Sequence, residues 1–221
     1  MTESPSQAIE TLQRSRSMLE PVLASFEKRV AQFGADPRSA FWKDEEWQKR
    51  RYDILSRLFD EPDRLGGISI TDFGCGYGAF FDYLADRPVM KNSRYTGIDM
   101  SAAMIEEANA RIRDSRATFQ SHLIATETAD YTVVCGTYNM NLGANRDEWA
   151  DYVKASLEQL WSKTTKAMGF NMLRFDAPDQ YPGLYYADGM EFVKFCNETL
   201  SPDITYTDDR PLPDWTIIIR R

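Results

Sequence analysis

Residues 70–80 read ITDFGCGYGAF and place a strand, a glycine-rich turn and the start of a helix directly after one another. Residues 68–73 predict a buried strand. Gly74, Gly76 and Gly78 then alternate along a tight turn, and a helical pattern begins immediately after them. A strand that runs through alternating glycines into a helix brings bare backbone and a helix N-terminus against a ligand. We therefore expect residues 70–80 to form a ligand-binding turn around which the fold is built.

Strand and helix patterns alternate on the C-terminal side of this turn. The alternation favours an α/β fold with a parallel sheet and helices on both of its faces. The chain ends differently, because residues 204–207 and 215–219 are two extended runs with no room for a crossover helix between them. Such a pair is expected to be antiparallel. The other expected strands are 68–73, 94–99, 117–121, 130–135 and 166–173, and the expected helices are 79–86, 101–114, 145–162 and 188–199.

Helical patterns also precede the turn and predict an N-terminal helical cap. An apolar stripe covers residues 9–33, and Pro21 is expected to break or kink it into two helices. A further helix is expected over residues 44–59. The predicted division is therefore a helical cap or lid over residues 1–62 and a sheet domain over residues 63–221. The stripe is expected to pack on the sheet domain or on a second copy of the chain, so a homodimer through these helices is a hypothesis.

The composition argues against several functional classes. The 221 residues carry a formal net charge of −8, and the whole acidic excess falls after residue 60. Proteins that grip nucleic acid or anionic membranes normally show a basic face, and this sequence shows none. No apolar run reaches transmembrane length, and residues 1–20 are too polar for a signal peptide. The three cysteines have neither disulfide nor metal-ligand spacing. We therefore expect a cytoplasmic protein that binds no nucleic acid, no membrane and no metal.

Two classes of cofactor use a turn of this kind. Gly74, Gly76 and Ala79 match the dinucleotide-binding fingerprint, which on its own is a weak signal. Residues 72–78, DFGCGYG, match a second pattern better. They resemble the acid-x-Gly-x-Gly-x-Gly motif of the class I S-adenosylmethionine (SAM)-dependent methyltransferases.

The resemblance to this family covers roughly residues 40–221. Residues 95–101, YTGIDMS, resemble its second motif, which is a strand ending in an acid, and residues 130–136 resemble its fourth strand. The antiparallel C-terminal pair is similar to the family's sixth and seventh strands. The resemblance implies the Rossmann-like class I methyltransferase fold, a mostly parallel seven-stranded sheet with an antiparallel C-terminal strand. Two further segments resemble a branch of small bacterial methyltransferases. They are the segment with Trp42, Gln48, Arg51, Tyr52 and Leu55, and residues 184–188.

The resemblance also implies a SAM site around the turn. Asp99 would accept hydrogen bonds from both ribose hydroxyls, at the usual strand–helix–strand spacing from the first glycine. Met100 would pack on the adenine, or it is a plain core methionine. Asp72 would hold the amino group of SAM, directly or through water. The backbone of the turn and the residue after the fourth strand complete the predicted site at Gly74, Cys75, Gly76 and Gly136.

Three residues upstream of the turn are further candidates for the SAM site. Arg51 stands alone on an otherwise apolar helix face and therefore needs a buried partner. That partner is either the SAM carboxylate or an acid of the sheet domain, and the sequence leaves both open. Gln48, one turn earlier on the same face, would share the contact with SAM. Trp42 would line the cofactor mouth, or it is a packing residue.

The methyl acceptor is expected near the ends of the fourth and fifth strands, because parallel sheets bind ligands at the carboxyl ends of their strands. Arg174 begins an aromatic-rich segment there and would bind an anion. Tyr138 and His122, the only histidine, are weak candidates for a catalytic role, and no general base is assigned. The candidate substrate-binding residues are Tyr138, Asn139, Arg174, Tyr185 and Tyr186.

These patterns together predict a SAM-dependent methyltransferase that yields S-adenosylhomocysteine (SAH). In-line methyl transfer from a sulfonium requires mainly alignment of the reacting atoms and exclusion of water. A nitrogen or oxygen atom of a small molecule is the expected acceptor, because the cap is small and no recognition domain is attached. A protein methyltransferase and a non-catalytic SAM-binding protein are the alternatives. A nicotinamide oxidoreductase is disfavoured, since too little chain follows the turn for a substrate domain.

Overall fold

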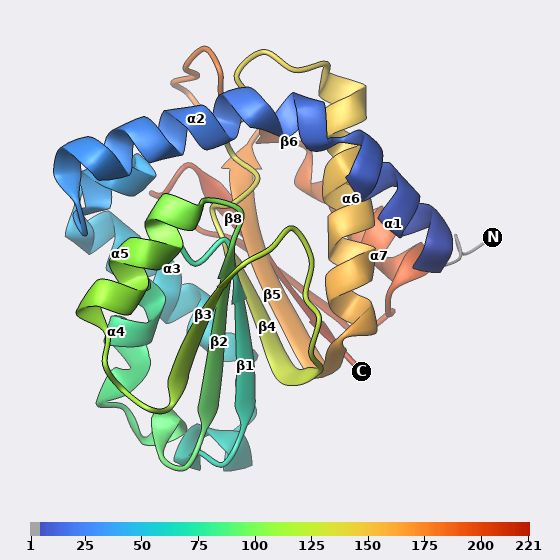
Figure 1. Ribbon diagram of the computed structural model, residues 1–221. Coiled ribbons are helices and arrows are strands. Elements are labelled where there is room, and N and C mark those ends of the chain that lie inside the picture. The colour runs from blue at the N-terminus through green and yellow to red at the C-terminus, as the bar shows by residue number, and fades with distance from the viewer. Residues whose placement is uncertain (1–4) are drawn as a thin grey trace.

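A single eight-stranded sheet forms the centre of the computed structural model, which describes residues 5–221 (Figure 1). Its strands are β1 (Ser69–Phe73), β2 (Arg94–Asp99), β3 (Ala117–Ser121), β4 (Ala129–Cys135), β5 (Thr164–Arg174), β6 (Tyr186–Ala187), β7 (Ile204–Asp208) and β8 (Asp214–Arg220). The order is β3-β2-β1-β4-β5-β8-β7, and β6 pairs with β5 beside this path. Strands β1 to β5 pair in parallel, whereas β8 is antiparallel to β5 and β7. The predicted sheet is confirmed, and the short β6 adds to its seven expected strands.

Helices account for most of the remaining described chain. The α-helices are α1 (Pro5–Arg14), α2 (Arg16–Phe33), α3 (Glu45–Leu55), α4 (Ala79–Ala85), α5 (Ala102–Arg111), α6 (Arg146–Ser162) and α7 (Gly189–Thr199). The short 3-10 helices are η1 (Pro37–Ala40), η2 (Ser56–Leu58), η3 (Pro62–Leu65) and η4 (Pro88–Met90). No helix within residues 5–221 is long and apolar enough to cross a membrane.

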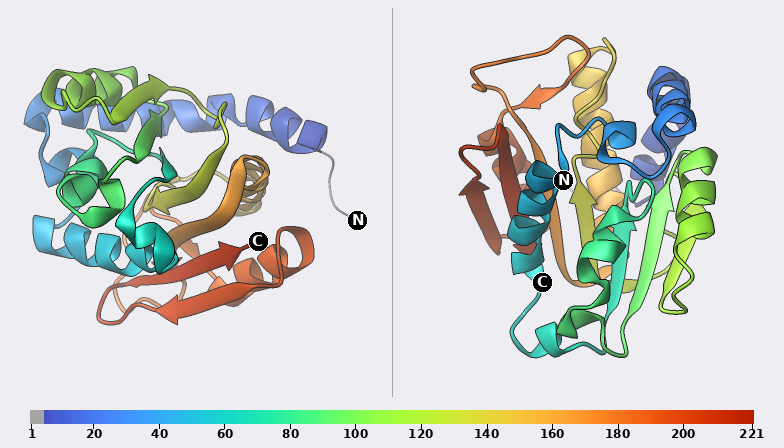
Figure 2. Two further views of the ribbon diagram at one scale, coloured as in Figure 1. Left: turned by 90° about the horizontal axis from the view of Figure 1, so that it is seen from below. Right: turned by 90° about the vertical axis from the view of Figure 1, so that its left-hand side faces the viewer.

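Both faces of the sheet are covered, as expected for parallel strands. Helices α3 and α4 lie on one side and α6 and α7 on the other (Figure 2). Leu55 and Phe80 belong to the core on the first side, and Trp149 belongs to the core on the second. Strand β8 contributes side chains to both cores, because Ile218 packs on the first side and Ile217 on the second. This explains why its sequence is a continuous apolar run rather than an alternating one.

The N-terminal helices pack on the sheet domain of their own chain. Helix α1 contacts α6, and α2 contacts α5 and η1. Helix α2 crosses above the carboxyl ends of the parallel strands (Figure 1). One of the two predicted packing modes is therefore observed, and a homodimer through these helices stays a prediction. The division into residues 1–62 and 63–221 also stays a prediction, and its boundary falls at η3.

The break between the first two helices lies at Ser15, not at Pro21 where the sequence predicts it. The Ser15 hydroxyl donates to the carbonyl oxygen of Thr11 at 2.9 Å, which satisfies one acceptor at the end of α1. Pro21 lies inside α2 on its exposed side. Near the start of a helix, the missing N–H of a proline removes only one intrahelical hydrogen bond. Helix α2 therefore continues through this position.

Candidate active site

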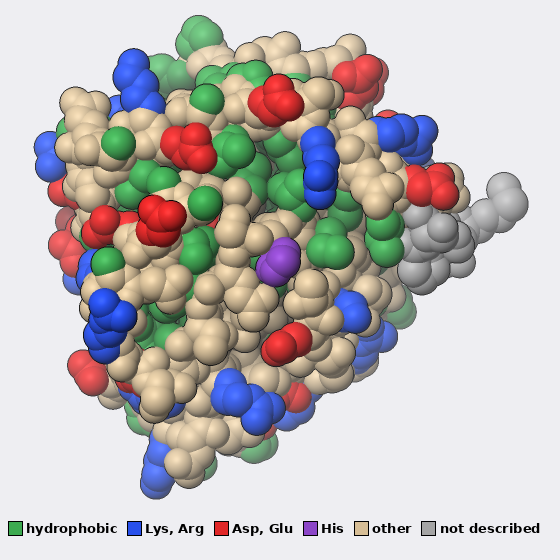
Figure 3. Space-filling model, in the orientation of Figure 1, with side chains coloured by type: hydrophobic (Ala, Val, Ile, Leu, Met, Phe, Trp, Pro, Cys, Tyr) green, Lys and Arg blue, Asp and Glu red, His purple; other side chains and the backbone are tan. Residues whose placement is uncertain are grey.

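A cavity opens where the carboxyl ends of β1, β2 and β4 meet beneath α2. It encloses about 940 Å³, including the part that is open to solvent. Hydrophobic side chains gather below α2 on this face of the molecule (Figure 3). Nine of the predicted SAM-binding residues line the cavity: Trp42, Gln48, Asp72, Gly74, Cys75, Gly76, Asp99, Met100 and Gly136.

The glycine turn brings the ends of β1 and β4 into direct contact. Gly74 has a φ of +77°, and a Cβ atom there would lie 2.2 Å from Oγ1 of Thr137. The Thr137 hydroxyl itself donates to the carbonyl oxygen of Phe73 at 2.9 Å. Only a residue without a side chain fits between these two strand ends. The turn therefore leaves bare backbone facing the cavity, as predicted.

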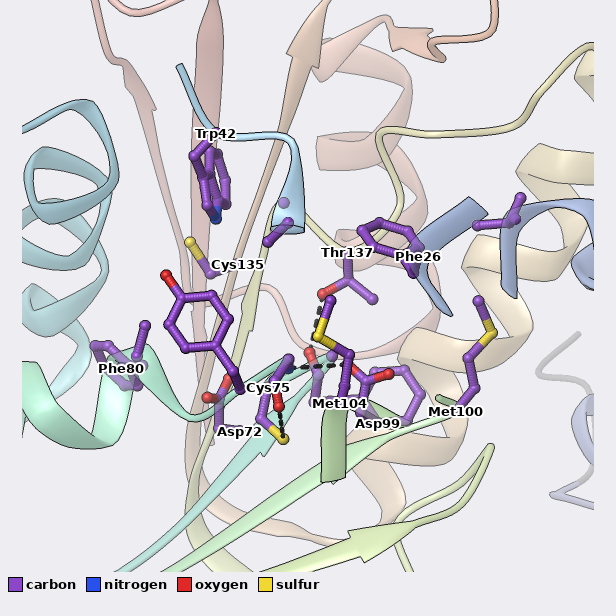
Figure 4. Close-up of a pocket in the computed structure, with 18 of the residues that line it drawn as sticks. Phe26, Trp42, Asp72, Cys75, Phe80, Asp99, Met100, Met104, Cys135 and Thr137 are labelled. Carbon is purple, nitrogen blue, oxygen red and sulfur yellow. Dashed lines mark hydrogen bonds between the residues drawn. The ribbon is translucent and has the colours of Figure 1, made fainter. Parts of the chain in front are cut away.

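Asp99 organises the other side of the turn from the end of β2 (Figure 4). Its Oδ2 accepts the N–H of Gly76 at 2.9 Å, and its Oδ1 accepts the N–H of Ser101 at 2.9 Å. Burial raises the pKa of Asp99, while these backbone donors act in the opposite direction. Each carboxylate oxygen has two lone pairs and uses one on the backbone. Because Asp99 also lines the cavity, its carboxylate has acceptor capacity left for hydroxyl groups of a ligand.

Asp72 lies at the base of the cavity and is buried. The hydroxyl of Tyr95 donates to its Oδ2. Burial raises the pKa of Asp72 to about 7, against the effect of the Tyr95 hydrogen bond and with a smaller contribution from the charge of Asp99. A buried carboxylate with one neutral donor is under-stabilised in its charged form. It would gain strongly from a cation placed in the cavity.

Arg51 is paired with an acid of the sheet domain and does not line the cavity. It forms a buried ion pair with Asp214 of β8, which is the second of the two partners considered from sequence. The assignment of Arg51 to the SAM carboxylate is therefore corrected: Asp214 already satisfies its charge. Gln48 does line the cavity, and its Oε1 accepts the Tyr77 hydroxyl at 3.5 Å.

Tyr138 and Asn139 turn away from the cavity. The Tyr138 side chain is fully buried beside α6, where its hydroxyl is 2.7 Å from Oγ of Ser156. Burial raises the pKa of Tyr138 well above its usual value, so this phenol is a poor base. The Asn139 Oδ1 accepts the N–H of Leu173 at 3.0 Å. Both residues fix the strand ends, and neither lines the cavity as a catalytic or substrate-binding side chain.

The other three predicted substrate-binding residues also have structural partners. Arg174 binds Asp176 at 2.6 Å and Asp208 at 3.3 Å, which neutralises the cation that was expected to hold an anion. The Tyr185 ring lies 5.0 Å from the Arg146 guanidinium carbon. The hydroxyl of Tyr186 accepts the N–H of Tyr181 at 2.9 Å. The segment after β5 folds on itself, and Arg174, Tyr185 and Tyr186 lie outside the cavity lining.

Side chains of α2 and α6 also line the cavity. Leu19, Val22 and Phe26 of α2 line the cavity from above, and Trp149 and Tyr152 of α6 line its flank. From the sequence, the α2 positions are expected to be ordinary helix packing, and Trp149 and Tyr152 are not singled out. The signal was the apolar stripe of α2, but a stripe does not reveal that part of it faces a cavity.

His122 is the one predicted catalytic candidate that lines the cavity. It follows β3, and its backbone N–H donates to the carbonyl oxygen of Asp99 at 3.1 Å. Its side chain is exposed at the rim. Within residues 5–221 there is no group of three or more His, Cys, Asp or Glu side chains that could hold a metal ion.

Comparison with known proteins identifies the family. Residues 70–163 match a family model described as a methyltransferase domain. The chain is 34% identical over 157 residues to "Putative methyltransferase Rv1506c" of Mycobacterium tuberculosis, a match that covers 70% of this chain and 93% of the relative. The chain belongs to the class I SAM-dependent methyltransferases.

Solved methyltransferase structures share this fold. DhpI in a complex with SAM and HEP superposes with a TM-score of 0.64 at 12% identity, covering 94% of this chain and 99% of that chain. The magnesium protoporphyrin IX methyltransferase ChlM of Synechocystis PCC 6803, with bound SAM, superposes with a TM-score of 0.58 at 15% identity, covering 80% of this chain and 79% of that chain.

The residues of this methyltransferase fit SAM, which supplies a methyl group on a positively charged sulfur. The free lone pairs of Asp99 match the two ribose hydroxyls. Asp72 is a buried carboxyl group whose charged form the amino group of SAM would stabilise. The bare backbone of the glycine turn leaves room for the methionine chain between these two carboxylates. The predicted cofactor is thus confirmed by the family, and the donor set is consistent with it.

Proposed function

We propose that this methyltransferase transfers the methyl group of SAM in line to a nitrogen or oxygen atom of a small molecule. The observation that carries the proposal is the position of α2. Its side chains Leu19, Val22 and Phe26 lie over the cavity, so the acceptor must fit beneath a helix. A protein substrate would need an open groove along which an extended segment could lie.

The residues of the chain would contribute mainly by orientation and by excluding water. Asp72 would hold the amino group and Asp99 the ribose, which fixes the donor at both ends. The aromatic side chains Trp42, Tyr52 and Tyr152 line the cavity and would exclude water from the reacting atoms. An amine that is neutral when bound needs no general base, whereas a hydroxyl would need one, and His122 is the remaining candidate.

The fold is compatible with acceptors of this kind. ChlM, which shares it, is named for magnesium protoporphyrin IX, a small molecule. At 15% identity this likeness says nothing about which acceptor this chain uses. The choice of a small molecule over a protein chain therefore depends on the covered cavity.

Isotope transfer from labelled SAM tests the proposal. The purified chain would be incubated with methyl-labelled SAM and a cell extract, which is then separated into small-molecule and protein fractions. We expect the label to accumulate in a small-molecule product and to require the intact chain. The Asp99→Ala variant serves as the control for background methylation. Label that accumulates in protein instead would refute a small-molecule acceptor, and no transfer to any fraction would favour a non-catalytic SAM-binding protein.

A further inference from the structure

A series of buried polar contacts runs behind the cavity from α3 through β8 and β5 to the end of β4. Arg51 pairs with Oδ2 of Asp214, and Nδ2 of Asn171 donates to Oδ1 of the same carboxylate at 3.4 Å. Oδ1 of Asn171 in turn accepts the N–H of Gly136 at 2.8 Å. Arg51, Asn171 and Asp214 are all buried. These contacts connect a helix of the N-terminal cap to a residue that lines the cavity.

A second route connects Arg51 to Gly136 through the ring of Trp42. The guanidinium carbon of Arg51 lies 4.7 Å from the centroid of the Trp42 ring. Trp42 packs so closely on Gly136 that a Cβ atom there would lie 2.5 Å from Cη2 of the indole. Trp42 and Gly136 line the cavity, whereas Arg51, Asn171 and Asp214 do not. Three buried side chains thus fix two lining residues in a closed ring of contacts, which we call the Gly136 ring.

Stability alone does not account for the Gly136 ring. Desolvation of a buried ion pair offsets much of its attraction, and apolar side chains of similar volume often stabilise a fold at least as well. Nη1 of Arg51 donates to the carbonyl oxygen of Trp47 at 3.0 Å, but its buried Nε has no partner among the described residues. A buried donor without a partner lowers stability. We therefore attribute to these contacts a second effect, which is to fix the positions of Trp42 and Gly136.

We propose that Arg51, Asn171 and Asp214 are positioning residues that hold Trp42 and Gly136 against the half of SAM that carries the amino acid and the sulfonium. The adenosine half is bound elsewhere, at Asp99 and the ends of β2 and β3. Removing a contact of the Gly136 ring therefore weakens binding of the amino acid half of SAM and leaves binding of the adenosine half unaffected. The inference depends on the SAM site and not on the identity of the methyl acceptor.

Titration calorimetry with two ligands tests this division. SAH carries the adenosine and the amino acid but a neutral sulfur, whereas 5′-methylthioadenosine lacks the amino acid. In the Asn171→Ala variant, the affinity for SAH is expected to fall about tenfold or more, and that for 5′-methylthioadenosine to change less than about twofold. A merely structural role would weaken both ligands alike. An equal loss for both, or an unchanged affinity for SAH, overturns the proposal.

Two further variants make the test independent of the folding of Asn171→Ala. Arg51→Lys keeps a positive charge near Asp214 but loses the planar group over Trp42, so it should show the same selective loss to a smaller degree. Arg116→Lys is the matched control, because Arg116 binds Asp114 and the carbonyl oxygens of Ala85 and Met90 outside the cavity. It should leave both affinities unchanged. Unchanged SAH binding in Arg51→Lys, or a selective loss in Arg116→Lys, also overturns the proposal.

A double-mutant cycle tests the route through the indole. If Asn171 acts by placing Trp42, the losses of SAH affinity in Asn171→Ala and Trp42→Phe should combine less than additively. Fully additive losses would show that the two residues act independently, and this part of the proposal would then be wrong.

Discussion

At the residue scale, Asp99 holds the glycine turn with the same carboxylate that we propose binds the ribose of SAM. Two of its lone pairs hold the turn and the start of α5 through Gly76 and Ser101. The same side chain lines the cavity. Because the backbone fixes both oxygens before any ligand arrives, the carboxylate is preorganised for a pair of hydroxyl groups.

Removing the Asp99 carboxylate should therefore abolish useful SAM binding. For Asp99→Ala we expect at least about a hundredfold loss of affinity, or about 3 kcal/mol, measured by calorimetry with SAM or SAH. Glu106→Ala, an exposed position on α5, is the matched control and should bind normally. Wild-type affinity in Asp99→Ala would refute the ribose assignment.

Asp72 makes the stability of the ligand-free protein depend on pH. Its pKa is about 7 in the fold against 3.8 in the unfolded chain, because the carboxyl is buried. Between these values the folded state keeps a proton that the unfolded state releases, so this group lowers the free energy of unfolding as the pH rises toward 7. The Asp72→Asn variant keeps an acceptor for Tyr95 and lacks this dependence.

We expect Asp72→Asn to be more stable than the wild type by up to about 3 kcal/mol at pH above about 7, with a difference that shrinks toward about pH 5. Urea denaturation across this range measures it. A difference that stays constant with pH would mean that Asp72 is not the titrating group.

Some residue roles could be predicted from sequence, and others could not. The position of Asp72, Asp99, Gly74 and Gly76 at the cavity could be predicted, because they belong to two short motifs that resemble those of the family. The sequence could not show whether Arg51 pairs with SAM or with an acid of the sheet domain. Asp214 lies more than 160 residues away and reaches α3 only through the antiparallel register of β8. Tyr138 follows β4 closely, and only its side-chain direction separates a core residue from a cavity residue.

At the scale of elements, α2 decides how the cavity is closed. Its contacts with α5 and η1 place Leu19, Val22 and Phe26 over the strand ends. The apolar stripe predicted the helix, and it left the packing open between the sheet domain and a second copy of the chain. The position of the helix break was wrong, because proline is tolerated near a helix start when its ring faces solvent.

Replacing Pro21 tests this explanation of α2. Pro21→Ala restores one N–H to the helix interior and removes a poor helix former, so we expect about 1 kcal/mol of added stability. For a chain of this size, that corresponds to a rise in Tm of about 2–4 °C, measurable by calorimetry. A lower Tm would instead mean that the proline shapes the path of α2 over the cavity.

At the scale of the whole molecule, sequence pattern predicted the sheet better than the site. Alternating strands and helices and the short C-terminal connection were enough for the parallel strands and the antiparallel β8. Part of the cavity, by contrast, is lined by side chains of α2, α3 and α6, which come together only in the folded chain. The account therefore depends on one claim: SAM and its acceptor share the chamber between the glycine turn and α2.

Hydrogen–deuterium exchange with and without SAH tests this claim most directly. The account predicts slower exchange at residues 72–76, 99–101 and 135–137 and, in the same experiment, at residues 19–26 of α2. Protection of the turn without any change in α2 would contradict a covered chamber, and protection elsewhere in the chain would contradict the site itself.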